Sequence, residues 1–460
     1  MKKKCKNIDV TTTDTVKDWV RDCILRHKQR YDFRDMLFEY GVTKAQYSEA
    51  LDTHNYSSFN DAFEKITAEA CRRIRERKLD LTPVRIREQQ DKTTGKVRMI
   101  GCEPPMQQIF DYIAVYSCNE IWNGRIVPQQ ASSVPGRGQV YGVKMLKRYI
   151  EADNRAIRYA KKHPEKAGNY SSKCRYVVKL DIKKCYPSAN MNIFMKLFEH
   201  DCGNDALIWL WSELLKSHKI NGYTGFMIGA LVSQWACQFM LSFIYREAMS
   251  LTYVRRGKKH KCVEHMVMFM DDMALFGSNR KKLREAVEHI IKFTKEKLGF
   301  DIKPNYMIHE LGQIDMMGYV IYRNGTVSIR ARNYIKSRRL KLRYMKRHYL
   351  TTDQAKRMVS YKGFYIHSDY NKPGMMPVFK AAQRIISKGE KKKWKEDSMQ
   401  NSRSVSSICS TGTEAQKQGS GRTSMRKLLR TALSGLQTRF TSLGRFYPRQ
   451  NLMRISTVIS

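Results

Sequence analysis

Paired cysteines, a secretory leader and a membrane-spanning run are all missing from the sequence. Its 11 cysteines form no CxxC pair and no metal-ligand spacing, which argues against a zinc site or a disulfide framework. Met1–Lys4 leads into the polar Thr11–Asp14 rather than into the apolar core of a signal peptide. The longest apolar stretch, residues 225–245, contains Ser233 and Gln238, so it predicts a buried helix rather than a membrane span. We expect a cytoplasmic protein with free thiols and no membrane partner.

Acidic residues are scarce. Lys and Arg number 85 against 43 Asp and Glu, which gives a formal net charge of +42. Such an excess predicts a large phosphate-binding surface. Part of it lies in the carboxyl-terminal tail, because the only acid between Ser398 and Ser460 is Glu414, among ten Lys or Arg. From about Lys388 the composition turns charged and then Ser-, Gln-, Thr- and Gly-rich, which predicts a disordered linker.

Three carboxylates lie at the ends of apolar runs. Asp271 and Asp272 interrupt a β-like stretch over residues 266–276, and Asp181 follows the strand-like run 175–180. Adjacent aspartates usually mark a turn, but a charge buried without a partner is costly and needs a reason. Two divalent cations roughly 3.5–4 Å apart, bridged by carboxylates from neighbouring strands, supply one. The pattern therefore predicts a metal-dependent nucleotide polymerase.

At these residues the chain resembles the reverse transcriptases, in order over about residues 80–385. Leu180–Ser188 is similar to their first catalytic motif, and Phe269–Asp272 resembles their YxDD box with Phe in place of Tyr. Three further segments match in order: residues 225–234 resemble the segment under the incoming nucleotide, residues 298–305 the lysine-bearing motif, and residues 317–319 the primer-grip turn.

The resemblance implies an α+β fold: a right-hand polymerase with a ferredoxin-like palm, fingers and a helical thumb. The expected divisions are an N-terminal helical extension over 1–78, fingers and a template-contact loop over 79–173, a palm over 174–325, a thumb over 326–388, and a basic, partly disordered tail over 389–460.

The resemblance also implies two Mg²⁺ ions, with Mn²⁺ as the alternative. Asp181, the carbonyl of Ile182 and Asp271 would hold them, and Asp272 would be a further ligand or support the primer end. Lys303 would protonate or stabilise the leaving pyrophosphate. A solvated lysine remains the alternative for Lys303.

Two β-rich runs, Val84–Glu88 and Lys96–Ile100, predict a basic fingers hairpin. Guanidinium groups suit triphosphate oxygens, so Arg98 is the first candidate and Lys96 and Arg85 are the next. Solvated charges on an edge hairpin are the alternative.

Further nucleotide contacts come from the resemblance alone. It places Tyr186, five residues after Asp181, under the sugar, where the ring would reject a 2′-hydroxyl and favour DNA synthesis; packing between strand and helix is the alternative. It also assigns nucleotide contacts to Gly229, Ser233 and Gln234.

Two segments are candidates for nucleic-acid binding. Within the resemblance, the Gly-rich loop 131–139 brings Arg137 and Gly138 to the template, and the helix predicted over 143–159 continues a basic surface. The run 329–347 holds nine Lys or Arg with interleaved aromatics, which favours a thumb that grips the template–primer duplex. Its main candidates are Lys336, Arg338, Arg339 and Lys341.

Residues 228–234 resemble the [ILV]GxxxSQ variant of diversity-generating retroelements, a bacterial group. The expected function is copying a structured RNA into DNA, with an RNA template, a DNA or RNA primer, dNTPs and an accessory protein as partners. An antiphage defence reverse transcriptase, a non-catalytic maturase-like RNA-binding protein and an RNA-templated RNA polymerase remain alternatives. Three intact carboxylates argue against the second of these, and Tyr186 argues against the third.

Overall fold

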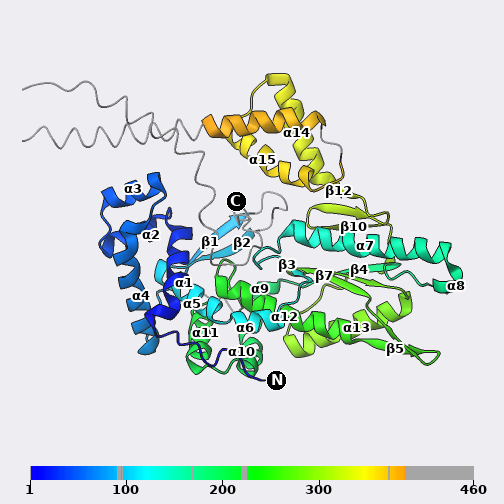
Figure 1. The fold of residues 1–460 in the computed structure, drawn as a ribbon, viewed down its shortest axis with the longest axis horizontal. Coiled ribbons are helices and arrows are strands. Elements are labelled where there is room, and N and C mark those ends of the chain that lie inside the picture. The colour runs from blue at the N-terminus through cyan, green and yellow to red at the C-terminus, as the bar shows by residue number, and fades with distance from the viewer. Residues whose placement is uncertain are drawn as a thin grey trace, which may run out of the picture. The chain divides into compact units, whose positions relative to one another are not determined.

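The computed structural model describes residues 2–90, 95, 97–167, 170–218, 225–370 and 373–388. The chain divides into two compact units, the first ending at Ser328 and the second starting at Ile329 (Figure 1). The tail over 389–460 and Lys96 lie outside the described residues. The described residues form an α+β fold, as expected.

The first unit opens with helices that are part of its main core. Val16 and Val20 of α1 and Phe33 of α2 are fully buried in the same apolar cluster as Phe110 of α5. Within the helical extension expected over 1–78, apolar residues at helical spacing give helix α4, with a buried face that includes Ile66. These elements are α1 (Thr13–His27), α2 (Tyr31–Glu39), α3 (Lys44–Thr53), η1 (Ser57–Phe59) and α4 (Asn60–Arg75).

The next segment starts with the predicted basic hairpin and ends with a long helix. Strands β1 and β2 pair antiparallel, and Gln89 lies opposite Arg98. Helix α7 runs for 24 residues and is longer at both ends than the helix expected over 143–159. The elements are β1 (Arg85–Gln90), β2 (Val97–Cys102), α5 (Pro105–Ser117), α6 (Asn119–Arg125), β3 (Gln130–Ala131), α7 (Gln139–Lys162) and α8 (Pro164–Ala167).

A five-stranded sheet in the order β3-β7-β8-β4-β9 forms the centre of the first unit. Strands β4, β7 and β8 pair antiparallel, and β3 pairs parallel with β7. In the view of Figure 1, α12 and α13 lie below these strands and α7 above them. The elements are β4 (Tyr176–Asp181), α9 (Cys185–Ser188), α10 (Met191–Asp201), α11 (Asp205–Ser217), α12 (Leu231–Ser250), β5 (Thr252–Arg255), β6 (Lys258–Lys261), β7 (His265–Phe269), β8 (Asp272–Gly277), α13 (Arg280–Leu298) and β9 (His309–Glu310).

The expected helix over 225–245 is correct in type but not in its start. Helix α12 begins only at Leu231, because Gly229 has φ +115° and its position leaves no room for a Cβ, which would lie 2.5 Å from the carbonyl oxygen of Gly101. Only glycine adopts that backbone without strain. The residues before Leu231 instead run beside β2, where the N–H of Gly101 donates to the carbonyl of Ile228 at 2.8 Å.

A small sheet in the order β10-β11-β12 follows, and its last strand reaches the boundary of the two units. The second unit has its own core, which includes Leu340, Met358, Tyr365 and Phe379. Thr351 starts α15 with a capping box. The elements are β10 (Gln313–Met316), β11 (Tyr319–Tyr322), β12 (Val327–Ile329), α14 (Ala331–Arg347), α15 (Thr352–Ile366), η3 (Pro373–Met375) and a helix over 376–388.

The ten cysteines in the described part of the chain are free thiols, nine of them buried. Within the same residues, no helix is both long enough and apolar enough to cross a bilayer.

Candidate active site

Three neighbouring strands bring the predicted carboxylates together. Asp181 at the end of β4 lies directly opposite Asp272, the first residue of β8. Phe269 at the end of β7 also lies opposite Asp272, which leaves Met270 and Asp271 as the connection between β7 and β8. Residues opposite each other in an antiparallel pair have Cβ atoms only about 5 Å apart. The carboxylates therefore gather at one end of the central sheet.

The turn that carries Asp271 is held in a strained conformation. Met270 has φ +51°, a left-handed conformation that costs a non-glycine residue about 1–2 kcal/mol. The carbonyl of Asp271 accepts a hydrogen bond from the N–H of Ile182 at 3.2 Å, which ties the turn to the residue after Asp181. Strain of this kind persists only where the surroundings impose it, as at functional sites.

The electrostatics of Asp271 reflect its crowded position. Burial raises the pKa of its carboxyl to about 6, and the negative charges of Asp272 and Asp181 act in the same direction. Lys303 opposes the shift, and its Nζ lies 2.6 Å from Oδ1 of Asp181. That contact is an ion pair rather than an aligned hydrogen bond. The site thus holds more negative charge than the protein neutralises, which is the condition for cation binding.

Lys303 reaches the site through backbone pairing. Ile302 forms an antiparallel bridge with Ile182, the N–H of Lys303 donates to the carbonyl of Asp181 at 2.9 Å, and Lys183 donates to the carbonyl of Asp301. Neither of these hydrogen bonds uses the carbonyl of Ile182.

The donor set fits a hard divalent cation, because carboxylate and carbonyl oxygens are the ligands that Mg²⁺ prefers. The side chains are not arranged as a finished site, however. Over the described ranges, no group of three or more His, Cys, Asp or Glu side chains is placed to hold one ion jointly. The ammonium of Lys303 provides the positive charge beside Asp181 instead.

Tyr186 lies close to the carboxylates. Burial raises the pKa of its phenol well above the usual value, and the charge of Asp271 adds to this effect. Its hydroxyl bonds Ser133, and its backbone carbonyl accepts from the N–H of Phe226 at 2.9 Å. A Cβ at Gly225 would lie 2.2 Å from the carbonyl oxygen of Pro187, so only glycine permits this close approach.

The fingers hairpin places two of its three candidates on one face. Because Gln89 pairs with Arg98 and Arg85 pairs with Cys102, the side chains of Arg85 and Arg98 point to the same side of the hairpin. Arg98 is exposed. Arg85 is exposed too, but its Nη2 donates to the hydroxyl of Tyr31 at 2.6 Å. The third candidate, Lys96, lies outside the described residues.

The predicted nucleotide contacts around α12 differ in exposure. Gly229 is exposed and Gln234 is partly buried, whereas Ser233 is completely buried. The hydroxyl of Ser233 faces Nδ1 of His218 at 3.4 Å. Ser233 therefore has no surface for a nucleotide, and any effect it has on one is indirect.

A buried polar network beneath α12 was missed by the sequence reasoning. Oδ2 of Asp111 accepts hydrogen bonds from the N–H groups of Leu231 and Val232 at 2.9 and 3.1 Å, which satisfies the start of α12. Glu103 lies between Gln107 and His218, at 3.4 Å from each. The sequence signal for this network is Asp111, an acid within the otherwise apolar residues 109–115.

Burial keeps this network largely uncharged. It raises the pKa of Glu103 to about 7 and that of Asp111 well above its usual value, and the neighbouring Glu103 adds to the shift of Asp111. It lowers the pKa of His218 to about 4. Neutral acids and a neutral imidazole are the states that a dry interior favours.

Glu103→Gln should gain stability relative to the unchanged protein as the pH rises. The pKa of Glu103 is raised from 4.5 to about 7 on folding, so its contribution is complete below pH 4.5 and is lost as the pH rises towards 7. Full loss amounts to about 3 kcal/mol. Thermal unfolding at about pH 5, 6, 7 and 8 measures the difference in stability between Glu103→Gln and the unchanged protein, because the linkage acts over roughly this pH range.

Glu288→Gln, at an exposed carboxyl of α13, is the matched control for the loss of one carboxyl and is measured at the same pH values. A stability difference for Glu103→Gln that does not change with pH would contradict a raised pKa at this position.

The Gly-rich loop lies beside the turn that holds Met270 and Asp271. Nε2 of Gln238 in α12 donates to the carbonyl of Ser132 at 2.9 Å and contacts Sδ of Met270 at 2.9 Å. Gln238 thus connects the loop to the turn, a role that sequence reasoning did not assign to it. Arg137 is partly buried and donates to the carbonyl of Val127 at 2.9 Å, whereas Gly138 is exposed at the start of α7.

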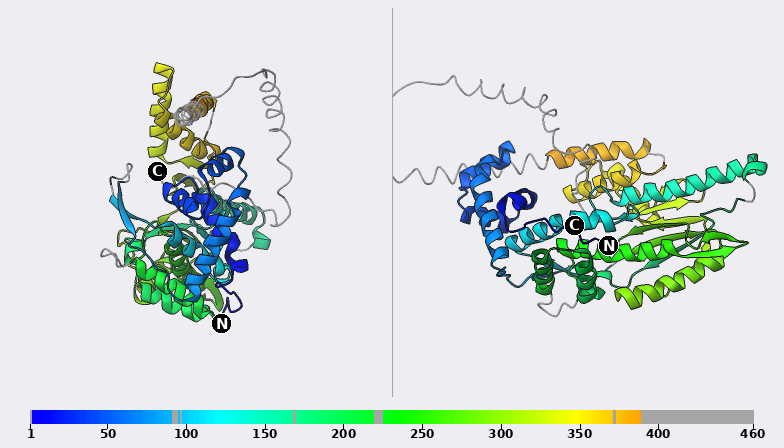
Figure 2. Two further views of the ribbon diagram at one scale, coloured as in Figure 1. Left: turned by 90° about the vertical axis from the view of Figure 1, so that its left-hand side faces the viewer. Right: turned by 60° about the horizontal axis from the view of Figure 1, so that its bottom comes forward.

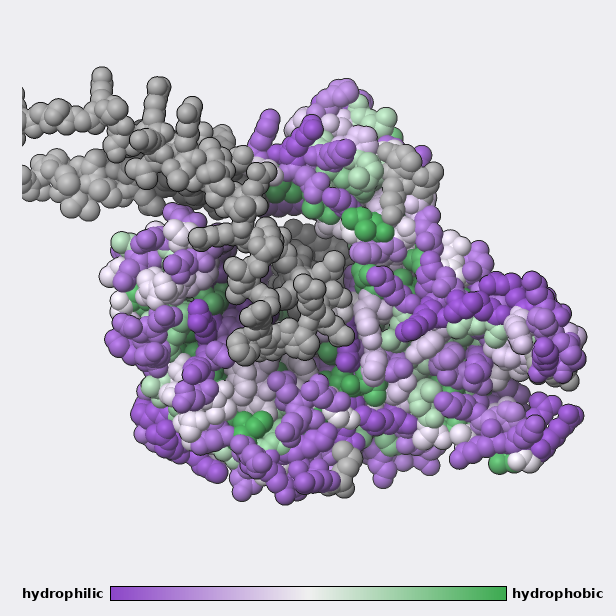
Figure 3. Space-filling view, in the orientation of Figure 1, coloured by the Kyte–Doolittle hydropathy of each residue, from purple (hydrophilic) through white to green (hydrophobic). Residues whose placement is uncertain are grey.

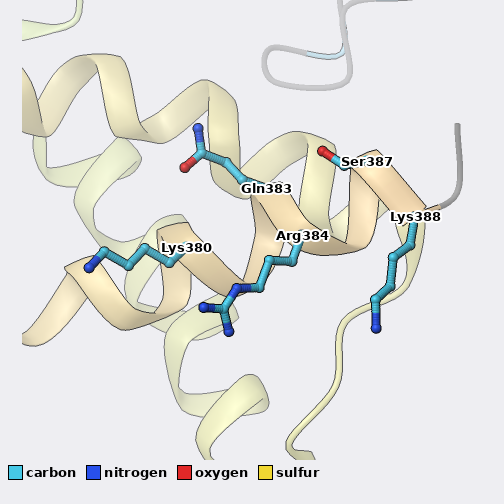
Figure 4. Close-up of a pocket in the computed structure, with 5 residues that line it drawn as sticks. All are labelled: Lys380, Gln383, Arg384, Ser387 and Lys388. Atoms are coloured by element: carbon cyan, nitrogen blue, oxygen red, sulfur yellow. The ribbon is translucent and has the colours of Figure 1, made fainter. Parts of the chain in front are cut away.

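In the second unit, the basic run forms α14. Arg338 and Arg339 are exposed, and Lys336 and Lys341 are partly buried. On the helix over 376–388, an open pocket of about 400 Å³ is lined by Lys380, Gln383, Arg384, Ser387 and Lys388 (Figure 4). Figure 4 shows the three basic side chains extending to the same side of the helix. This pocket contains none of the proposed catalytic residues.

Comparison with known proteins gives one family. The family model described as reverse transcriptase (RNA-dependent DNA polymerase) matches residues 89–321, which include all three carboxylates and Lys303. No curated protein matches the sequence.

Solved telomerase structures from Candida tropicalis are similar, each with a TM-score of 0.36. The apo enzyme truncated of its C-terminal domain is 14% identical, and the match covers 55% of this chain and 55% of that one. The chain therefore spans about half the length of that structure. The apo enzyme is 13% identical, with 85% and 77% covered, and the complex with a TWJ fragment of telomeric RNA is 12% identical, with 69% and 55% covered.

Proposed function

The chain belongs to the reverse transcriptase family, and we propose that it copies a structured RNA into DNA by two-metal nucleotidyl transfer. The matching family model is described as an RNA-dependent DNA polymerase, which supports nucleotidyltransferase activity. The observation that supports the mechanism best is the pairing of Asp181 with Asp272 at the end of the sheet where Asp271 is crowded enough to have a raised pKa.

In this proposal, Asp181, Asp271 and the carbonyl of Ile182 hold two Mg²⁺ ions, or Mn²⁺, and Asp272 is a further ligand or supports the primer end. Bound metal lowers the pKa of an attacking hydroxyl and stabilises charge on the leaving pyrophosphate. Lys303 adds a positive charge beside Asp181, and the ammonium of Lys303 would act on the leaving pyrophosphate.

The incoming dNTP lies between the fingers hairpin and α12 in this proposal. Arg98, with Lys96 and Arg85, would bind its triphosphate, and Tyr186 would lie under its sugar. Gly229 and Gln234 have surface for direct contact, whereas Ser233 would act through the position of α12. The Asp111 carboxyl at the start of α12 supports that arrangement.

Template and primer contacts are proposed on both units. Arg137 and Gly138 would approach the template beside the catalytic turn. On the proposed thumb, four basic residues of α14 would bind the template–primer duplex: Lys336, Arg338, Arg339 and Lys341. Exposed guanidinium and ammonium groups suit phosphate backbones.

We place the enzyme in a bacterial retroelement of the diversity-generating kind, on the sequence of residues 228–234. The second candidate is an antiphage defence reverse transcriptase, which shares the same core motifs. A cognate structured RNA and an accessory protein are the partners this role would require. A maturase-like protein without catalysis is disfavoured, because all three carboxylates are present and gathered at one end of the sheet.

Primer extension tests the reaction directly. On an RNA template with a paired primer and Mg²⁺, we expect extension with dNTPs and none with NTPs supplied alone. Extension with NTPs only would indicate an RNA polymerase, and the absence of both would support a maturase-like role. Sequencing the RNA that copurifies with the protein separates the retroelement role from the defence role.

A further inference from the structure

A basic hairpin projects from the first unit and has no part in the proposed reaction. Strands β5 and β6 pair antiparallel from Thr252↔Lys261 to Arg255↔Lys258. The two turn residues, Arg256 and Gly257, both have positive φ, +50° and +71°, as in the tight type I′ hairpin turn. Figures 1 and 2 show the hairpin extending beyond the central sheet.

The charge of this hairpin is unusual for a two-stranded ribbon. Residues 252–261 contain five Lys or Arg and no acid, and Arg255 lies directly opposite Lys258. Like charges in that position destabilise the pair. None of the ion pairs among the described residues involves these five side chains, all of which are exposed. Because these like charges weaken the hairpin, we expect them to serve a binding function.

The charges also lie on both faces of the ribbon. Arg255 and Lys258 point to one face, and Lys259 and Lys261 to the other, because side chains alternate along a strand. On the first face, Tyr253 stacks on His260 with ring centroids 5.4 Å apart. A flat anionic surface such as a bilayer would meet only one of these faces, whereas a nucleic acid offers phosphates on both sides of a groove.

The C-terminal end of α7 is also basic. Tyr149 stacks on His265, the first residue of β7, with centroids 4.2 Å apart, so the helix extends past the end of β7 that the hairpin precedes. Beyond that point Arg155, Arg158 and Lys162 follow helical spacing on one face, interrupted only by the exposed Tyr159. Figure 3 shows mostly hydrophilic residues on both projections, with a small hydrophobic patch at the tip of the lower one.

This surface is remote from the catalytic carboxylates. Strand β7 runs from His265 to Phe269 before the turn that holds Asp271, a length of roughly 17 Å. The hairpin joins its far end, where the N–H of Cys262 donates to the carbonyl of Leu251. We name it the distal basic surface, and its members are Arg155, Arg158, Lys161, Lys162, Arg255, Arg256, Lys258, Lys259 and Lys261.

We infer that the distal basic surface binds the phosphate backbone of a folded part of the template RNA that lies outside the active site. The inference rests on the proposed copying of a structured RNA. Exposed cations without ion-pair partners supply the affinity by releasing counterions, and recognition of RNA stems depends largely on backbone and shape. The enzyme would thereby hold a stem of its template while the catalytic end copies the single strand.

The test compares two RNA templates with the same primer site. One is just long enough to fill the active site, and the other is extended by a stable RNA stem. The hairpin variant is Arg255→Gln, Arg256→Gln, Lys258→Gln and Lys259→Gln. Its matched control removes four dispersed exposed lysines, by Lys44→Gln, Lys65→Gln, Lys292→Gln and Lys297→Gln.

The hairpin variant should bind the stem-extended template at least about tenfold more weakly than the control variant does. Its slope of log affinity against log salt should fall by up to about 3, or about 0.7–0.9 for each lost contact. Affinity for the short template and extension on it should match the control. A charge-retaining variant, Arg255→Lys, Arg256→Lys, Lys258→Arg and Lys259→Arg, should restore binding, which separates charge from folding.

Any of three results would overturn the inference. The first is that the hairpin variant and the control variant bind the stem-extended template equally well, and the second is that the hairpin variant loses affinity for both templates to the same extent. The third is that the hairpin variant keeps its RNA affinity and loses binding only to vesicles of phosphatidylserine and phosphatidylcholine. Failure of the unchanged protein to synthesise DNA on the short template would instead refute the proposed function, because RNA binding is measured separately.

Discussion

Asp271→Asn should abolish DNA synthesis on an RNA template while leaving RNA affinity nearly unchanged. Asn keeps the shape of the side chain but removes the negative charge that would bind a metal ion. Losing a metal-held carboxylate costs several kcal/mol in the transition state, or roughly a thousandfold in rate. Template binding is spread over many phosphates and does not depend on this group.

The fold should tolerate this change. Burial and the charges of Asp272 and Asp181 raise the pKa of Asp271 to about 6, so ionising this carboxyl costs more than in a free aspartate, and a neutral amide removes that repulsion. Primer extension and filter binding on one preparation measure both effects. Asp52→Asn, at an exposed position of α3, is the control and should behave as the unchanged protein. Extension by Asp271→Asn at a rate near that of the control would remove Asp271 from the catalytic set.

The elements around the carboxylates could be predicted because their signals are local. Apolar runs of strand length flank Asp271 and Asp272, and the runs became β7 and β8. The amphipathic spacing over 279–297 became α13, which Asn279 caps and Gly299 ends in a left-handed conformation. In each case the residues that define the element are neighbours in the sequence.

The features that sequence reasoning missed depend on distant residues. The start of α12 is determined by Asp111, 120 positions away, and by the close approach of Gly229 to Gly101. In the sequence, Gln238 indicates only a polar residue that excludes a membrane span, whereas in the structure its side chain contacts Gln130, Ser132 and Met270. Such pairings are created by tertiary packing, which single-sequence patterns do not encode.

The N-terminal helices illustrate the same limit. Helical spacing is evident in these residues, but no local pattern indicates that their core is continuous with that of α5. Arg30 donates to the carbonyl of Glu103 at 3.2 Å, and Tyr31 accepts from Arg85 in β1. The extension therefore contacts both the buried network under α12 and the hairpin of β1 and β2.

Tyr186→Ala should admit ribonucleotides without destroying polymerisation. The ring lies next to Asp271, and its removal would open space for a 2′-hydroxyl while the backbone contact of Tyr186 with Phe226 remains. A steric clash of this size typically costs 1–3 kcal/mol, so discrimination between dGTP and GTP should fall roughly ten- to a hundredfold. Steady-state kcat/KM for each nucleotide on the same template measures the ratio.

Two controls keep the result for Tyr186→Ala interpretable. Tyr186→Phe removes only the hydroxyl that bonds Ser133 and should keep the discrimination, since the ring forms the steric wall. Truncating a buried aromatic side chain can cost about 3–5 kcal/mol, so the thermal midpoint and dGTP incorporation of Tyr186→Ala are measured alongside. If this variant is folded, incorporates dGTP and still excludes GTP as strongly as Tyr186→Phe does, the ring only packs between strand and helix and another group selects the sugar.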